Sequence, residues 1–168
     1  MDFRLAVMQD LVQLKDMYAQ IVKNMDANGI CIWDDIYPFD FFEEDINSDR
    51  LYVLLNNNEI ISAFALCHNN AGEKAVKWND DYSSAMYIDR FGVNVKYAKQ
   101  GNGSLMIEKA KRTAKTLGAE YLRLFVVDIN EPAIRLYTKN GFIKADGVYN
   151  ETFDDGFVLR EYGYEIRL

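Results

Sequence analysis

One stretch organises the chain: Val93-Asn-Val-Lys-Tyr-Ala-Lys-Gln-Gly-Asn-Gly-Ser-Leu-Met-Ile107. An extended segment runs there into Gly101 and Gly103, and an amphipathic helix follows directly. Glycines let a backbone approach a ligand closely, and the first N–H groups of a helix attract an anion. The layout predicts a phosphate-binding turn. Because a Gly-x-Gly pair also occurs in ordinary turns, the rest of the sequence has to supply the other parts of such a site.

Length and composition predict one soluble domain, residues 1–168, with 49% hydrophobic and 27% charged residues. No basic segment opens the chain, and no apolar run approaches the roughly 18 residues of a spanning helix, so we expect a cytoplasmic protein without a membrane partner. The net charge of −7 disfavours nucleic acid as a partner. Cys31, Cys67 and His68 do not have the spacing of zinc ligands, so we expect no metal.

Hydrophobic periodicity predicts a strand and a long helix at the start of the chain. Residues 3–7 are short and apolar enough for the strand. Asp10, followed three places later by Gln13, has the pattern of a capping box, and apolar residues then recur every three or four positions. We expect a helix over about residues 10–27 that packs on the core.

An aromatic and acidic segment, residues 33–46, comes next, and we expect a short helix in it after Pro38. Residues 51–55 and 59–66 are rich in branched side chains and flank the polar turn Asn56-Asn-Asn58. This pattern predicts an antiparallel β-hairpin.

The second half of the chain alternates strands and helices. After a polar loop over residues 69–84, we expect a long strand over residues 85–95 and a helix from Gly103 to Gly118. A strand over residues 121–127 follows at once. Strand, helix and strand at this spacing predict a right-handed crossover that joins parallel neighbours.

A further helix begins at Asn130-Glu131-Pro132, because proline suits the first turn of a helix, and it ends at Gly141. Residues 142–149 and 157–168 then predict a closing hairpin. Aromatic residues alternate in its last strand, which suits the core or the interface of a homodimer equally.

Two segments together resemble the GNAT N-acetyltransferase superfamily. The turn Tyr97-Ala-Lys-Gln-Gly-Asn-Gly103 resembles the coenzyme A pyrophosphate loop of that family, Gln/Arg-x-x-Gly-x-Gly/Ala. Asn130-Glu-Pro-Ala-Ile-Arg-Leu-Tyr-Thr-Lys-Asn-Gly-Phe142 is similar to its second signature, Asn-x-x-Ala-x-x-x-Tyr-x-x-x-Gly-Phe, at every defined position. The loop departs from the pattern at Ala98, where Gln or Arg is usual. The resemblance covers essentially the whole chain and implies an α+β, three-layer acyl-CoA N-acyltransferase fold, with a mixed central sheet of about seven strands and about four helices.

The resemblance implies transfer of an acetyl group from acetyl-coenzyme A directly to a primary amine of a small molecule or peptide. It also implies that backbone N–H groups near residues 93–95 polarise the thioester carbonyl. The cofactor is expected to contact the end of the long strand, the glycine turn and the later helix, at Val93, Val95, Lys99, Gln100, Gly101, Asn102, Gly103, Ser104, Asn130, Ala133 and Tyr137.

Two residues are candidates for the proton transfers. Tyr137 occupies the family's position for the general acid that protonates the departing thiolate, although a tyrosine on the apolar side of a helix also suits the core. Asp89 is the candidate general base, because residues 87, 89 and 91 are expected to share one face of the long strand. A salt bridge is the alternative for Asp89, and His68 or a chain of water molecules is an alternative base. Asn130 is a helix cap that is also expected near the cofactor.

Trp33 and Tyr37 lie where the family builds its acceptor pocket, beside Asp34 and Asp35. Aromatic rings with carboxylates suit an ammonium group, and a buried aromatic cluster is the alternative. No motif identifies the acceptor. A non-catalytic acyl-CoA sensor or partner-binding module on the same fold is the alternative function. A P-loop or dinucleotide site is disfavoured, because Lys-Ser/Thr does not follow the glycines and a third glycine is absent.

Overall fold

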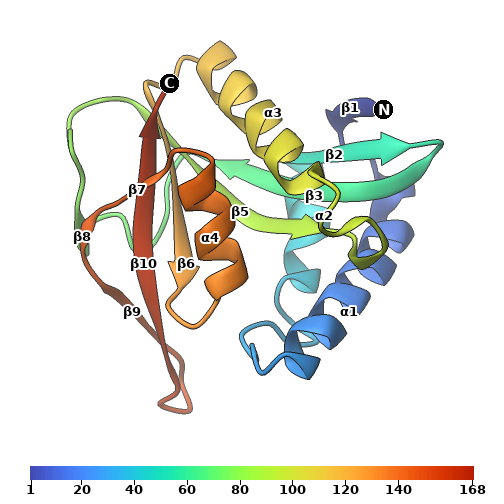
Figure 1. Cartoon of the computed structure of the whole chain (residues 1–168), viewed down its shortest axis with the longest axis horizontal. Helices are drawn as coiled ribbons and strands as arrows, with labels where there is room; N and C mark the ends of the chain where they lie inside the picture. The colour runs from blue at the N-terminus through green and yellow to red at the C-terminus, as the bar shows by residue number, and fades with distance from the viewer. The chain divides into compact units, whose positions relative to one another are not determined.

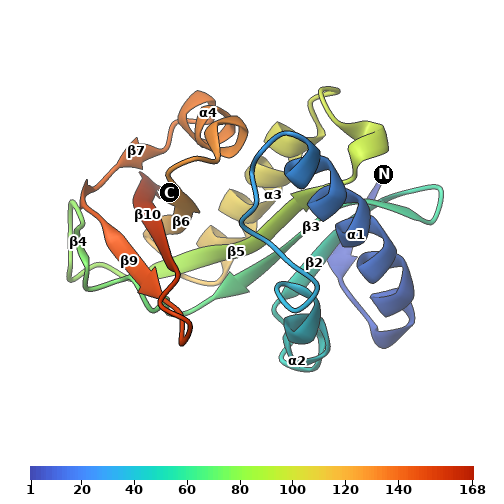
Figure 2. The ribbon, with the colours of Figure 1, turned by 90° about the horizontal axis from the view of Figure 1, so that it is seen from below.

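The computed structural model describes all residues, 1–168, and forms two compact units. The first unit consists of Met1–Leu66 and Arg90–Lys109, and the second of Cys67–Asp89 and Ala110–Leu168. The chain therefore passes from one unit to the other three times, as its colour gradient traces in Figure 1 and Figure 2. A single domain stays a prediction.

The first unit combines a mainly antiparallel sheet with two whole helices, half of a third helix and three short 3₁₀ turns. Its strands are β1 (Asp2–Leu5), β2 (Leu51–Asn56), β3 (Glu59–Cys67) and the last residues of β5 (Ala85–Val93), in the order β1-β2-β3-β5. Its helices are α1 (Leu11–Ala27), α2 (Phe42–Asn47) and the first half of α3 (Asn102–Thr116), and its 3₁₀ turns are η1 (Met8–Asp10), η2 (Phe39–Phe41) and η3 (Val95–Tyr97).

The periodicity of α1 and the hairpin predicted after it are both confirmed. Leu14, Tyr18 and Ile21 are buried along one face of α1. The β2–β3 hairpin is antiparallel, and its turn residues Asn57 and Asn58 have φ of 48° and 65°. Asparagine tolerates this left-handed conformation better than most residues, which explains the run of asparagines.

The predicted capping box at the start of α1 is wrong. The Asp10 carboxylate turns back and accepts hydrogen bonds from the Val7 N–H (2.8 Å) and the Arg4 guanidinium (2.7 Å). The side chain of Gln13 is bound elsewhere, since its Oε1 accepts from the N–H of Ile60. Residues just before the helix therefore bind the Asp10 carboxylate, and a residue 47 positions away binds Gln13, so neither side chain caps α1.

The second unit holds the rest of the mixed sheet, α4 (Glu131–Lys139) and the last part of α3. Its strands are β4 (Val76–Lys77), the first residues of β5, β6 (Tyr121–Val127), β7 (Ile143–Lys144), β8 (Asp146–Gly147), β9 (Tyr149–Thr152) and β10 (Val158–Arg167). Strand β5 pairs parallel with β6 from Ala85↔Tyr121 to Ile88↔Leu124, as the predicted crossover requires. Strand β10 pairs antiparallel with β6, β7 and β9, and β4 pairs with β8.

The predicted fold class is confirmed: the protein has a mixed sheet, of eight strands instead of about seven, and four α-helices. The long strand ends at Val93, two residues earlier than predicted, because the Asn94 side chain accepts a hydrogen bond from the Lys96 N–H (3.0 Å) and starts η3. No helix combines the length and hydropathy needed to cross a membrane.

Candidate active site

The glycine turn connects η3 to α3 within the first unit and has two left-handed residues. Lys99 has φ of 61° and Gly101 has φ of 84°. A Cβ added at Gly101 would meet no atom within 4 Å, so the backbone faces open space there. Because the first N–H groups of a helix lack carbonyl partners within it, Asn102 and Gly103 offer donors for an anion beside this opening. The turn thus offers backbone donors to an anion, and the pyrophosphate of coenzyme A as that anion stays a prediction.

Buried and charged side chains brace the turn. The Asn102 amide donates to the Tyr97 carbonyl (3.0 Å), and the Tyr97 hydroxyl donates to Glu59 (2.6 Å). The Lys96 ammonium pairs with the same carboxylate (2.9 Å). The hydrogen bonds from Tyr97 and Lys96 hold the pKa of Glu59 below its ordinary value. The loop conformation is therefore built before any ligand arrives.

The end of β5 presents backbone donors of a defined direction. The N–H of Asn94 donates to the carbonyl of Ile61 on β3 (2.9 Å). Successive N–H groups of an extended backbone point to opposite sides. The N–H of Val93, the last residue of β5, therefore points away from β3, whereas Val95 is the first residue of η3 and its part in binding a carbonyl oxygen stays a prediction.

The two predicted acceptor-site aromatics lie in one aromatic cluster with α1 and η2. The ring centroid of Trp33 is 5.8 Å from that of Tyr18 and 6.1 Å from that of Tyr37, and Tyr37 is 5.3 Å from Phe41. Trp33 and Tyr37 remain half-buried, so their rings are packed on one side and accessible on another. Binding of the acceptor by these two residues stays a prediction.

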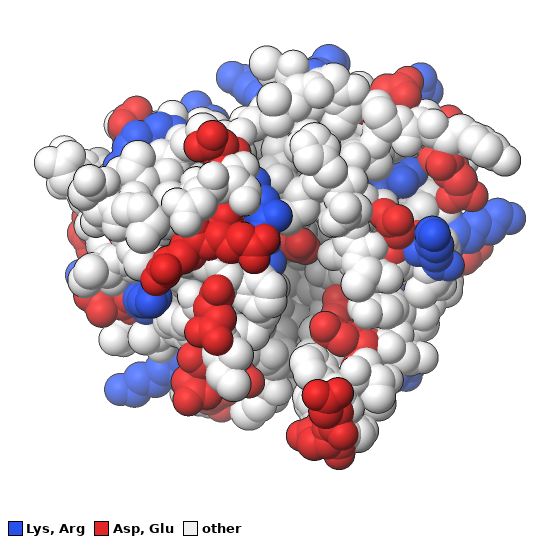
Figure 3. All heavy atoms as spheres, turned by 180° about the vertical axis from the view of Figure 1, so that it is seen from behind, with Lys and Arg blue, Asp and Glu red and all other residues white.

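A hollow of about 420 Å³ opens beside α1 in the first unit, and it is lined by Ala19, Val22, Lys23, Asp26, Asp34, Asp35 and Phe39. Acidic side chains are widespread on the face of the molecule in Figure 3, in keeping with the net charge of −7. Neither Trp33 nor Tyr37 lines the hollow.

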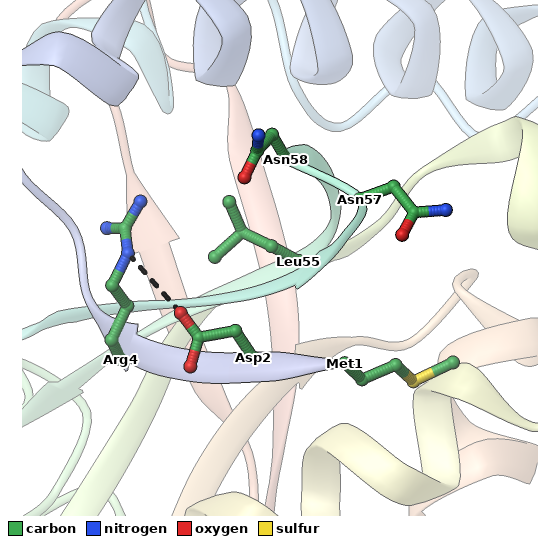
Figure 4. A pocket seen from close by; sticks show the side chains of 6 residues that line it. All are labelled: Met1, Asp2, Arg4, Leu55, Asn57 and Asn58. Carbon is green, nitrogen blue, oxygen red and sulfur yellow. Dashed lines mark ion pairs between the residues drawn. The ribbon is translucent and has the colours of Figure 1, made fainter.

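Another pocket of the first unit lies between β1 and the β2–β3 turn (Figure 4). It has a volume of about 290 Å³ and contains none of the predicted site residues. Arg4 on its wall already pairs with Asp10 (2.7 Å) and Asp2 (3.9 Å). We assign no ligand to this pocket.

In the second unit, the helix cap predicted at Asn130 is confirmed. The Asn130 side chain accepts from the Ala133 N–H (3.4 Å), and α4 ends before Gly141, which has φ of 89°. Tyr137 is only 6% exposed, and its ring centroid lies 5.8 Å from that of Phe142. The ring of Tyr137 is thus part of the core, so a chemical role rests on its hydroxyl.

Asp89 lies half-buried at the end of the second unit's part of β5, where it accepts a hydrogen bond from Asn70 (3.2 Å). The next residue, Arg90, has φ of 53°. This conformation lies between residues 89 and 91 and interrupts the regular alternation of a strand there, so the shared face of residues 87, 89 and 91 stays a prediction. The alternative base, His68, is exposed.

Sequence reasoning missed a carboxyl pair near Asp89. Glu161 on β10 is half-buried and hydrogen-bonded to Glu151 on the neighbouring strand β9. Burial, the hydrogen bond to Glu151 and the charges of Glu151 and Asp89 together raise the pKa of Glu161 to about 8. No motif marks Glu161, and only the β9–β10 register brings the two carboxyl groups together.

Replacing Glu161 with Gln is expected to change how stability depends on pH. The folded protein keeps the Glu161 proton up to about pH 8, whereas the unfolded chain loses it near pH 4.5, so this group makes the free energy of unfolding fall as pH rises between those values. Gln is neutral in both states. In urea unfolding, the free energy of unfolding of the variant minus that of the wild type should rise by about 1–3 kcal/mol between pH 5 and pH 8.5. If the free energies of unfolding of the variant and the wild type depend on pH in the same way, the prediction is contradicted. The control is Glu131→Gln, which replaces an exposed carboxylate on α4.

No three His, Cys, Asp or Glu residues form a group that could hold a metal ion. Of the two thiols, Cys31 is exposed and Cys67 is buried.

Residues 15–142 match the model of the acetyltransferase (GNAT) family, which is most of the chain. The chain belongs to the GNAT acetyltransferase family. A curated relative, the candidate phosphinothricin acetyltransferase YwnH of Bacillus subtilis (strain 168), is 28% identical over 103 residues. That match covers 61% of this chain and 59% of the relative, so the chain spans about three fifths of the length of the curated relative.

Solved GNAT structures match the whole fold. A candidate acetyltransferase of Staphylococcus aureus Mu50 is 25% identical with a TM-score of 0.73, covering 98% of this chain and 97% of that one. A GNAT-family acetyltransferase of Listeria monocytogenes 4b F2365 is 17% identical with a TM-score of 0.74, covering 99% and 94%. The likeness to the Listeria protein concerns the fold alone.

The predicted GNAT site residues fall into two sets. The first unit holds the end of β5, the glycine turn and the aromatic pair: Val93, Val95, Lys99, Gln100, Gly101, Asn102, Gly103, Ser104, Trp33 and Tyr37. The second unit holds Asp89, Asn130, Ala133 and Tyr137.

Proposed function

We propose that this protein is an N-acetyltransferase that transfers an acetyl group from acetyl-coenzyme A directly to a primary amine. The observation that carries the proposal is the glycine turn: Lys99 and Gly101 are left-handed, Asn102 and Tyr97 brace the loop, and α3 begins beside it. A family that uses acetyl-coenzyme A supports the identity of the pyrophosphate ligand. The cytoplasm as location and a homodimer remain predictions.

The proposed reaction forms one C–N bond and breaks one C–S bond. The neutral amine attacks the thioester carbonyl, whose developing negative charge is stabilised by the N–H groups of Val93 and Val95. Collapse of the tetrahedral intermediate expels the coenzyme A thiolate, which takes a proton from the Tyr137 hydroxyl. The nitrogen gives up a proton, which returns through solvent to the Tyr137 oxygen, so the products are an amide and a free thiol and the Tyr137 hydroxyl is restored.

The amine needs help to lose its first proton. An alkyl ammonium with a pKa of about 10.4 costs about 4–5 kcal/mol to deprotonate at pH 7. Asp89 is the proposed base, acting directly or through water, and Asn70 orients its carboxylate. Trp33 and Tyr37 are the proposed contacts of the acceptor.

Thiol release from acetyl-coenzyme A tests the proposal. Purified protein is incubated with amines that include polyamines, amino acids, peptides and phosphinothricin, the last because YwnH carries that name. Binding of acetyl-coenzyme A is measured in parallel by calorimetry. Thiol release with an amine supports the enzyme. Binding without release for every amine favours the non-catalytic acyl-CoA module, and absence of binding overturns both.

Replacing Ala98 with Gln is expected to tighten the binding of coenzyme A by about three- to tenfold. Ala98 is exposed at the end of η3, so the larger side chain has room, and its amide supplies the phosphate contact that the family's usual Gln or Arg would make. Calorimetric Kd values measure the effect. Ala98→Leu, of similar size but without a donor, is the matched control, and equal Kd values for the two variants would contradict the prediction.

A further inference from the structure

Arg90 combines a bulky side chain with a backbone conformation that such residues rarely adopt. Its φ of 53° lies inside β5, between the residues that pair with β6 and those that lead to Val93. Glycine, asparagine and aspartate are the usual residues in this region, so a bulky residue persists there only when its surroundings hold it. The contacts of Arg90 therefore show which groups stabilise its left-handed conformation, and they indicate its role.

A buried carboxylate clamps the side chain. The guanidinium donates to both oxygens of Asp45 on α2, from Nε at 2.6 Å and from Nη2 at 3.0 Å. Asp45 is fully buried and Arg90 is 8% exposed. Asp45 also accepts from Arg50 (2.6 Å), and the Arg90 guanidinium lies 5.2 Å from the ring centroid of Phe41. A two-pronged ion pair of this kind fixes direction as well as distance.

A second set of contacts holds the main chain at Arg90 and at Gly92. The Tyr18 hydroxyl donates to the Arg90 carbonyl, and the Ser62 hydroxyl donates to the Gly92 carbonyl (2.7 Å). The phenol of Tyr18 also lies against Gly92, where a Cβ would come within 2.8 Å of Cζ. The backbone from Arg90 to Gly92 is thus held by α1, α2 and β3 at once.

We infer that the Asp45–Arg90 pair is a positioning device that sets the direction of the Val93 and Val95 N–H groups toward the thioester carbonyl. The inference rests on the proposed function. Donors that stabilise a developing oxyanion have to be oriented in advance, and a left-handed residue three positions before Val93 decides the path of the strand that carries them. The ion pair keeps Arg90 in that conformation, so it acts on the carbonyl through the backbone without touching it.

The protein contains a second buried Arg–carboxylate pair that serves as a comparison. Arg123 on β6 pairs with Glu165 on β10 (3.1 Å), and both residues are less than 10% exposed. Arg123 lies in the part of β6 that pairs regularly with β5 and β10, and it is not a left-handed residue. Breaking this pair lowers stability without turning the Val93 and Val95 donors.

The test uses acetyl-coenzyme A labelled with ¹³C at the acetyl carbonyl, whose resonance reports polarisation and needs no acceptor. Four full-length variants are compared with the wild type: Arg90→Ala, Arg90→Gly, Asp45→Asn and the control Glu165→Gln. Glycine adopts the left-handed region freely, so it keeps the backbone path while removing the clamp. Folding is checked by circular dichroism, and Kd and kcat are measured below the unfolding temperature of every variant.

The wild type is expected to shift the bound carbonyl resonance downfield from that of the free thioester. Arg90→Ala and Asp45→Asn should lose at least half of that shift, and their kcat should fall about tenfold while Kd stays within twofold. Arg90→Gly and Glu165→Gln should keep most of the shift and most of kcat. A full shift in folded Arg90→Ala, or in Asp45→Asn if Arg90→Ala does not fold, overturns the inference. A wild type that binds and shifts the carbonyl without turnover removes the proposed catalysis and leaves the positioning role standing.

Discussion

Replacing Tyr137 with Phe is expected to lower kcat about 100-fold while the Kd for acetyl-coenzyme A stays within twofold. The proposed role of Tyr137 depends on its hydroxyl alone, which protonates the departing thiolate. Its ring packs against Phe142, and Phe keeps that contact. Steady-state thiol release at saturating amine measures kcat, and calorimetry measures Kd. Loss of kcat without loss of binding is the pattern expected of an interaction made only in the transition state.

Tyr164→Phe is the matched control for this result. Tyr137 and Tyr164 are both tyrosines of the second unit and are both 6% exposed, but Tyr164 has no proposed role. The control should retain the wild-type kcat, and both variants should unfold within a few degrees of the wild type. An unchanged kcat in Tyr137→Phe would make this residue a core tyrosine only.

Replacing Asp45 with Ala is expected to lower the free energy of unfolding by about 3–5 kcal/mol, because the change leaves the buried guanidinium of Arg90 without its carboxylate. The same change removes the hydrogen bond from Arg50 (2.6 Å). Urea unfolding followed by circular dichroism measures the effect. A loss below about 1 kcal/mol would mean that water or another acid replaces Asp45.

Two further variants test whether the loss of stability in Asp45→Ala comes from a buried, unpaired charge. The double variant Asp45→Ala with Arg90→Met should be more stable than Asp45→Ala alone, since no charge is then buried unpaired. Glu131→Ala breaks a pair with Arg135 whose side chains are 74% and 69% exposed, and it should cost no more than about 0.5 kcal/mol. Comparing the two losses in the free energy of unfolding shows whether burial decides how much an ion pair stabilises this protein.

Local pattern was enough to predict most elements of the fold. The helix that starts after Asn130 has its cap and its glycine stop within one short signature, so every determinant lies close in sequence. The hairpin around Asn57 and Asn58 is similarly local. The strands β4 and β8 were not predicted, because two-residue strands are too short to have a period.

The candidate site was predictable only where a motif crosses it. The glycine turn and the helix that contains Tyr137 match family signatures. Asp45 and Arg90 are 45 positions apart, and neither the acidic run around Asp45 nor the strand around Arg90 contains a motif that predicts their ion pair. The same holds for Glu161, whose pKa depends on a hydrogen bond across two strands and on Asp89. Pairings of this kind arise from tertiary structure, which overrides the local pattern.

The interleaving of the two units has a consequence for the biosynthesis of the protein. The first unit needs Arg90–Lys109 to complete it, and the second needs both Cys67–Asp89 and Ala110–Leu168. A ribosome that has released only the first 66 residues has therefore produced no complete unit, and any fragment that contains one whole unit also carries a segment of the other. Fragments of this chain are poor substitutes for the whole, and a nascent chain has to keep its first strands from aggregating until residue 109 emerges.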